Sequence, residues 1–103
     1  MKLITKEIER ELEKHGSENM KPIFKLFNPC GAQTWLITGR EKDNHDILWG
    51  FADLGFGCVE FGTISLPELL GLQLPLGLSI ERDLHFKHEE GTNYLELNSL
   101  AGI

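Results

Sequence analysis

The chain has 103 residues, of which 41% are hydrophobic and 25% charged, and its formal net charge at pH 7 is −6. This length is typical of a single domain, and so acidic a chain is a poor nonspecific binder of nucleic acid, which requires clustered Lys and Arg. No apolar run reaches the roughly 20 residues of a membrane helix, and the N-terminus lacks the features of a signal peptide. We therefore expect a cytoplasmic protein with no membrane partner.

The charge is unevenly distributed along the chain. Residues 1–25 contain six Lys and Arg against five Glu, whereas residues 26–103 contain four Lys and Arg against eleven Asp and Glu. The acidic excess therefore lies after residue 25. Such a surface favours solubility or a partner with a basic surface.

A helix is predicted over residues 5–15, before the acidic part of the chain. Thr5 is suited to cap its N-terminus, and Gly16 is suited to end it in the left-handed conformation. One face of this helix carries an aliphatic residue every four positions, a narrow apolar stripe that predicts packing on a core. The residues of this stripe are Ile4, Ile8 and Leu12.

Four strands joined by short turns are predicted next, over residues 23–27, 33–38, 47–53 and 58–64. Consecutive strands with short connections are typical of an antiparallel meander. Trp35 and Trp49 lie on the second and third strands and are expected in the core, because a tryptophan buries a large apolar area. Cys30 and Cys58 are expected to be buried small residues, because free cysteine is among the most buried residue types.

A second, shorter helix is predicted after the fourth strand. Ser65 and Glu68 form a capping-box pattern, and Pro67 lies in the first turn, where its missing N–H is not needed. The helix should end near Gly71, with a buried face made of Leu66, Leu69 and Leu70. A turn at residues 74–77 and an extended segment at residues 78–87 then follow.

These elements predict an α+β fold: a small antiparallel β-meander of about four strands, an N-terminal helix, a short helix after strand four and a further extended C-terminal segment. The helices should cover one face of the sheet, because a sheet of this size needs a partner layer. We expect one domain over residues 1–103. It divides into the N-terminal helix (1–16), an α+β core (22–87) and a C-terminal tail (88–103).

The densest polar cluster contains Glu81, Arg82, Asp83 and His85. A carboxylate beside a histidine can tune it as a general base, and His85 with His88 could supply two metal nitrogens. On a strand, however, residues three apart point to opposite faces, so solvated ion pairs are the alternative interpretation.

Asp53 and Glu60 form a second candidate pair, because they lie on neighbouring strands. If they face each other, they could bind a cation or act as acid and base. The alternative for Asp53 is an ordinary turn residue before Leu54-Gly55. Neither cysteine has a second cysteine at metal-binding spacing, and the glycines at 55, 57 and 62 match neither a dinucleotide-binding motif nor a Walker loop, so we expect no cofactor and no resident metal.

The central segment also resembles a family of short bacterial proteins known only as a domain of unknown function, found on plasmids, integrative elements and phages. The residues that carry this resemblance are Leu26-Phe27, Pro29, Ala32, Thr34-Trp35-Leu36, Thr38, Asp53-Leu54-Gly55, Glu60, Gly62, Ser65-Leu66, Glu68-Leu69, Pro75-Leu76-Gly77-Leu78, Ile80-Glu81-Arg82-Asp83 and Phe86. The chain departs from the pattern at Gly39-Arg40, where the family commonly has an acidic residue after Thr38. The resemblance implies a setting on bacterial mobile elements and carries no catalytic residues.

Two functional hypotheses follow. The first is a non-enzymatic accessory factor that binds another protein with a basic surface, for example a host defence nuclease that it inhibits. The second is a small metal-assisted hydrolase that uses Asp53, Glu60, Glu81, Asp83 and His85, which requires those side chains to converge. Direct binding of DNA or RNA is the weakest hypothesis, and the sequence leaves the oligomeric state open.

Overall fold

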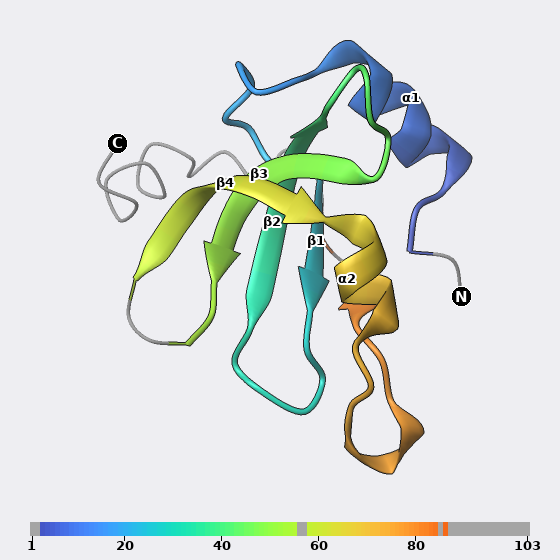
Figure 1. Ribbon diagram of the computed structural model, residues 1–103, viewed down its shortest axis with the longest axis vertical. Coiled ribbons are helices and arrows are strands. Elements are labelled where there is room, and N and C mark those ends of the chain that lie inside the picture. Colours follow the sequence, from blue (N-terminus) through green and yellow to red (C-terminus); the bar gives the residue numbers. More distant parts are fainter. Residues whose placement is uncertain (1–2, 56–57, 85, 87–103) are drawn as a thin grey trace.

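The computed structural model describes residues 3–55, 58–84 and 86, and it has the predicted α+β fold (Figure 1). Its strands form one antiparallel sheet in the order β4-β3-β2-β1-β5. The predicted extended segment thus contributes a fifth strand, which pairs with β1 at the edge of the sheet. In chain order the elements are α1 (Lys6–Lys14), β1 (Phe24–Phe27), β2 (Thr34–Arg40), β3 (Ile47–Asp53), β4 (Val59–Ser65), α2 (Leu66–Gly71), the 3₁₀ turn η1 (Pro75–Gly77) and β5 (Glu81–Arg82).

Both helices contribute to a hydrophobic core on one face of the sheet. The pairing of β1 with β2 places Phe24 opposite Ile37 and Leu26 opposite Trp35, and all four side chains are buried. Because side chains alternate along a strand, these residues share a face. The helices and the segment just before α1 complete this core with aliphatic residues: Ile4, Ile8, Leu12, Leu66 and Leu69.

The other face of the sheet carries a smaller aromatic group. The rings of Trp49 and Phe61 stack with centroids 6.0 Å apart, and Phe51 meets Phe61 edge-on at 5.0 Å. The indole Nε1 of Trp49 donates to Glu41 Oε1 at 2.6 Å. Trp35 therefore lies in the core as expected. Trp49 does not, because it is half-buried on the opposite face of the sheet.

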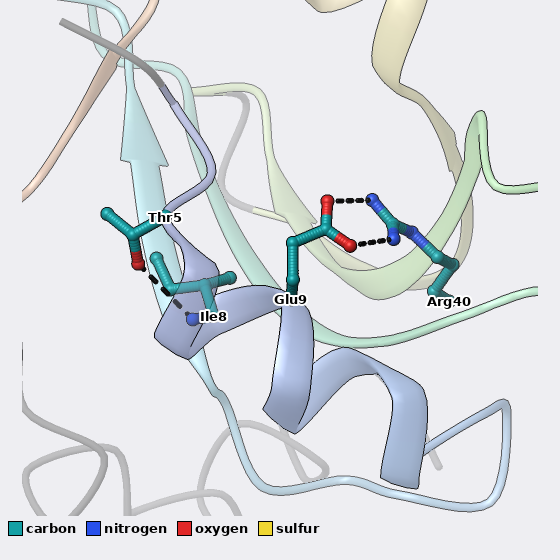
Figure 2. Close-up of polar contacts among 4 residues, drawn as sticks. All are labelled: Thr5, Ile8, Glu9 and Arg40. Atoms are coloured by element: carbon teal, nitrogen blue, oxygen red, sulfur yellow. Dashed lines mark hydrogen bonds and ion pairs between the residues drawn. The ribbon is translucent and has the colours of Figure 1, made fainter.

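Helix α1 begins as predicted but ends differently. The Thr5 hydroxyl accepts a hydrogen bond from the Ile8 N–H at 3.2 Å, which caps the helix (Figure 2). The prediction of a left-handed Gly16 is wrong, because the helix ends in an extended His15 and Gly16 has no positive φ. The chain instead turns onto β2, where the Arg40 N–H donates to the His15 carbonyl at 3.1 Å.

A β-bulge in β2 extends that strand beyond its predicted end. The register with β3 shifts between Ile37 and Gly39, and the strand continues to Arg40. Gly39 then lies so close to the end of α1 that an added Cβ would clash with the Gly16 carbonyl oxygen. A glycine is needed at this position because two backbones touch there.

Helix α2 is capped as predicted, although its buried face is narrower. The Ser65 hydroxyl accepts a hydrogen bond from the Glu68 N–H at 3.4 Å. Leu69 is buried and Leu66 is half-buried, but Leu70 is 58% exposed, so its predicted burial is wrong. Leu70 lies about 100° around the helix from Leu69, beyond the side that contacts the sheet.

The extended segment after η1 is shorter than predicted. Strand β5 covers two residues, and the Phe86 N–H then donates to the Asp83 carbonyl at 3.3 Å, which closes a turn after the strand. The predicted tail (88–103), His85 and His88 lie outside the described residues. Within the described ranges, no helix is long and apolar enough to cross a membrane.

The contact between Gly39 and Gly16 gives a direct stability test. We expect Gly39→Ala to lower the free energy of unfolding by about 1–3 kcal/mol, because the methyl group forces two backbones apart. Gly62→Ala is the matched control, since an added Cβ at this strand position meets no atom within 4 Å. Urea denaturation of the two variants measures the difference, and equal stabilities would contradict the proposed backbone contact.

Candidate functional site

The two carboxylates of the neighbouring strands do not face each other. In the register of β3 with β4, Asp53 pairs with Val59 and Ala52 pairs with Glu60. Because side chains alternate, Asp53 and Glu60 lie on opposite faces of the sheet. Asp53 Oδ1 instead accepts a hydrogen bond from the Gly55 N–H at 3.0 Å, as expected of a turn residue.

The charged triplet in and after β5 is also divided between separate places. Arg82 Nη1 donates to the Leu3 carbonyl at 3.1 Å, which ties the segment before α1 to the sheet edge. Asp83 Oδ2 lies 3.7 Å from Lys25 Nζ on the neighbouring strand. Glu81 lines a groove described below. His85, the fourth member of the cluster, lies outside the described residues.

These positions test the hydrolase hypothesis, because that hypothesis requires the carboxylates to converge on one site. Among the residues described, no group of three or more His, Cys, Asp or Glu side chains is arranged to hold a metal ion. The described members of the candidate set therefore lie at different edges and faces of the sheet.

The clearest buried polar contact lies elsewhere, between α1 and β2 (Figure 2). Arg40 Nη1 donates to Glu9 Oε2 at 2.8 Å, and Arg40 Nη2 donates to Glu9 Oε1 at 3.3 Å. The Arg40 side chain is 7% exposed and the Glu9 side chain 44%. Arg40 Nε is buried and has no hydrogen-bond partner in the structure, so Glu9 is the main compensation for this cation.

This contact lowers the pKa of Glu9. The main cause is the hydrogen bonding from Arg40, and the positive charge of Arg40 adds to it, against a smaller opposing effect of desolvation. A carboxylate whose pKa is lowered in the folded state stabilises the fold above its unfolded pKa and loses that contribution as the pH falls. Arg40 and its neighbour Gly39 are where α1 is attached to the sheet.

The most unusual surface feature is residues 70–78, the last two residues of α2 and the segment after them, which we call the leucine loop. In Figure 1 the part of this loop that follows α2 projects away from the sheet. Four of its leucine side chains are exposed: Leu70 (58%), Leu72 (43%), Leu76 (95%) and Leu78 (40%). Clustered exposed apolar side chains of this kind mark interaction sites in folded proteins.

The tip of the leucine loop has a strained but closed backbone. Leu76 has φ 62° and ψ 23°, the left-handed conformation, and Gly77 follows with φ 71°. For a residue with a Cβ this conformation costs roughly 1–2 kcal/mol. The Leu74 N–H donates to the Leu78 carbonyl at 3.1 Å and the Leu78 N–H donates to the Pro75 carbonyl at 3.3 Å, which closes the loop.

A neighbouring turn lies beside the loop. Cys30 Sγ is 3.9 Å from the Pro75 carbonyl oxygen, and Asn28 Oδ1 orders that turn by accepting the Cys30 N–H at 2.7 Å. Both cysteines are free and exposed, contrary to the expectation that they are buried. Each lies at a turn next to a strand end, where the core does not reach.

An apolar groove of about 600 Å³ runs along the base of the leucine loop. Its walls are the segment before α1, helix α2 and the segment from η1 to β5. Leu69 and Ile80, which line it, are 5% and 4% exposed and belong to the main core. The described residues that line it are Leu3, Ile4, Leu66, Leu69, Leu70, Gly77, Leu78, Ser79, Ile80 and Glu81.

Sequence reasoning missed this surface. It treated residues 74–77 as a turn and Leu70 as core. The available signal was composition, because residues 66–78 contain seven leucines and a single charged residue. A leucine-rich segment after a short helix is equally typical of a buried core segment. Composition alone therefore does not distinguish a buried segment from an exposed one.

The fold and this surface define a small α+β domain with an open antiparallel sheet and a projecting apolar loop. Over residues 2–103 the chain matches DUF2958, a family described as proteins of unknown function, and it belongs to that family. This agrees with the resemblance to a domain of unknown function seen in the sequence. No curated protein matches the chain, and no solved structure does.

The Glu9–Arg40 contact predicts a specific pH dependence. As the pH falls below about 4.3, the ordinary pKa of a glutamate, the wild-type protein should begin to lose the contribution of Glu9 to stability. In Glu9→Gln this part of the loss should be absent, and stability at pH 7 should be lower by about 1 kcal/mol, a modest value because Glu9 is partly exposed. Urea denaturation between pH 3 and 7 measures both effects.

Glu13→Gln, on an exposed position of the same helix, is the control. Parallel pH profiles of stability for wild type and Glu9→Gln would refute a stabilising contact between ionised Glu9 and Arg40.

The strain at Leu76 predicts a gain in stability on substitution. Asparagine tolerates the left-handed conformation, so Leu76→Asn should raise the free energy of unfolding by up to about 1 kcal/mol. Gly77→Ala, which puts a Cβ at the adjacent left-handed position, should lower it by a similar amount. Chemical denaturation measures both variants, and a destabilised Leu76→Asn would show that the side chain supports the fold.

Proposed function

We propose that this protein is a non-enzymatic accessory factor that binds another protein through the leucine loop. The observation that carries the proposal is Leu76, an apolar side chain that is 95% exposed on a left-handed backbone. Asparagine or glycine at this position would relieve the strain, and a polar side chain would suit the solvent. Leu76 thus has a strained backbone and an apolar side chain in water. A contact that forms only when a partner is present explains why a leucine occupies this position.

A projecting apolar residue of this kind acts as an anchor in protein interfaces. A few buried anchor residues carry most of the binding energy, and neighbouring residues exclude water from them. Leu72 and Leu78, which are also exposed, flank Leu76 on the same loop. In this proposal Leu76 enters a pocket of the partner while its neighbours seal the edge of the contact.

The net charge of −6 supports a partner with a basic surface. The setting we propose is the bacterial cytoplasm, in an organism or on a mobile element that carries a member of this family. Inhibition of a host defence nuclease is one form of the proposal, in which the basic surface is the partner's nucleic-acid groove. In each form, binding should weaken as the salt concentration rises, because charge attraction is screened.

Site-specific crosslinking tests the proposal. A photoreactive amino acid replacing Leu76 should capture one discrete host protein from a lysate, at low salt more than at high salt. Excess unlabelled wild-type protein should compete for this partner, whereas excess Leu76→Asn should compete at least tenfold less well.

The control places the same photoreactive amino acid at Glu60, an exposed position on β4. This position should not capture the partner. If positions 60 and 76 capture the same proteins, or if Leu76→Asn competes as well as wild type, the leucine loop is not the binding element.

A further inference from the structure

The apolar groove at the base of the leucine loop is held open by contacts on two sides. Arg82 Nη1 fixes the Leu3 carbonyl at 3.1 Å, which positions the wall before α1. The Leu74 N–H and the Leu78 carbonyl, 3.1 Å apart, fix the two arms of the leucine loop. The groove is therefore preformed, with a volume of about 600 Å³ that lies within the roughly 300–1,000 Å³ of ligand-binding sites.

The charged residues at the groove indicate which kind of occupant it favours. Among the described residues that line the groove, Glu81 is the charged one, and none is Lys, Arg or His. The cation of Arg82, next along the chain, is directed to the Leu3 carbonyl at the opposite wall. A second copy of this chain would bring the two Glu81 carboxylates together across one apolar contact, whereas a segment with Lys or Arg would neutralise the Glu81 carboxylate.

We propose that this groove binds an apolar segment of a second protein, with aliphatic side chains seated over Leu69 and Ile80 and a flanking Lys or Arg near Glu81. This inference rests on the proposed function and deepens it: the leucine loop anchors the partner, and the groove takes a segment of that same partner. An amphipathic helix with aliphatic anchors at i, i+3, i+4 and i+7 fits such a groove.

A peptide titration tests the groove without knowledge of the partner. The probe is a synthetic 14-residue amphipathic helix with Leu at the anchor positions and Lys at the remaining ones. Two matched peptides replace every Lys by Glu or every Leu by Ser. Added to the full ¹⁵N-labelled protein, the Leu/Lys peptide should shift the amide signals of α2 and residues 77–81 and bind at least tenfold tighter than either matched peptide.

Two pairs of variants locate the binding. Leu70→Ser changes a groove residue and should weaken the Leu/Lys peptide at least fivefold, whereas Leu54→Ser changes an exposed leucine outside both the lining and the leucine loop and should weaken it less than twofold. Glu81→Gln should weaken binding about threefold and reduce its salt dependence, whereas Glu60→Gln should do neither. Because Leu70 and Leu54 are both exposed, both serine variants should remain folded, which their ¹⁵N spectra verify.

The inference is overturned if the Leu/Glu peptide binds as tightly as the Leu/Lys peptide, or if the shifted signals lie away from the groove. It is also overturned if sedimentation shows a dimer of the wild-type chain that Leu70→Ser dissociates, because the occupant is then a second copy. These outcomes are separable from failure of the proposed function. Capture of a host protein at position 76 with no peptide effect at Leu70 leaves the function standing and rejects the groove.

Discussion

The attachment of α1 to β2 is the contact on which the rest of the structure depends. Glu9 pairs with the buried guanidinium of Arg40, and the backbones of Gly16 and Gly39 touch beside it. Glu9 is the main compensation for this buried cation, so the pair fixes the position of the helix and contributes modestly to stability. The bulge in β2 makes the contact possible, because it carries the strand on to Arg40 at the end of the helix.

The position of α1 in turn determines the groove. Leu3 and Ile4 precede the helix and form one groove wall, and the hydrogen bond from Arg82 to the Leu3 carbonyl connects that wall to β5. Helix α2 forms the opposite wall, and Leu70 lies beyond the side of this helix that contacts the sheet. A six-residue helix followed by a leucine-rich loop thus leaves apolar surface that neither helix covers. Leu70 and Leu78 belong to both the groove lining and the leucine loop.

Local signals in the sequence predicted the regular elements well. The caps at Thr5 and Ser65 were predictable because each depends on one side chain and a backbone N–H three residues away. Strand β3 has its predicted bounds, Ile47–Asp53, because its alternation and its flanking turns agree. These features depend on residues that are neighbours in sequence.

Features decided by tertiary contact were not predictable in the same way. Gly16 matched the pattern of a left-handed helix end, but the contact with β2 requires an extended exit. The partner of Arg40 is 31 residues away in the chain, and no local pattern connects it to Glu9. Leucine is typical of core positions, so the exposure of Leu70 and Leu76 follows only from the orientation of α2 on the sheet and the shape of the loop.

The central claim is that Leu76 is exposed for binding at the expense of stability. Isothermal titration of the captured partner into wild type and Leu76→Asn tests it most directly, with the unfolding free energy of each protein measured in the same buffer. The account predicts that Leu76→Asn binds at least tenfold more weakly, a loss of about 1.4 kcal/mol, while being as stable as wild type or more so. Equal affinities, or a loss of affinity matched by a loss of stability, would contradict it.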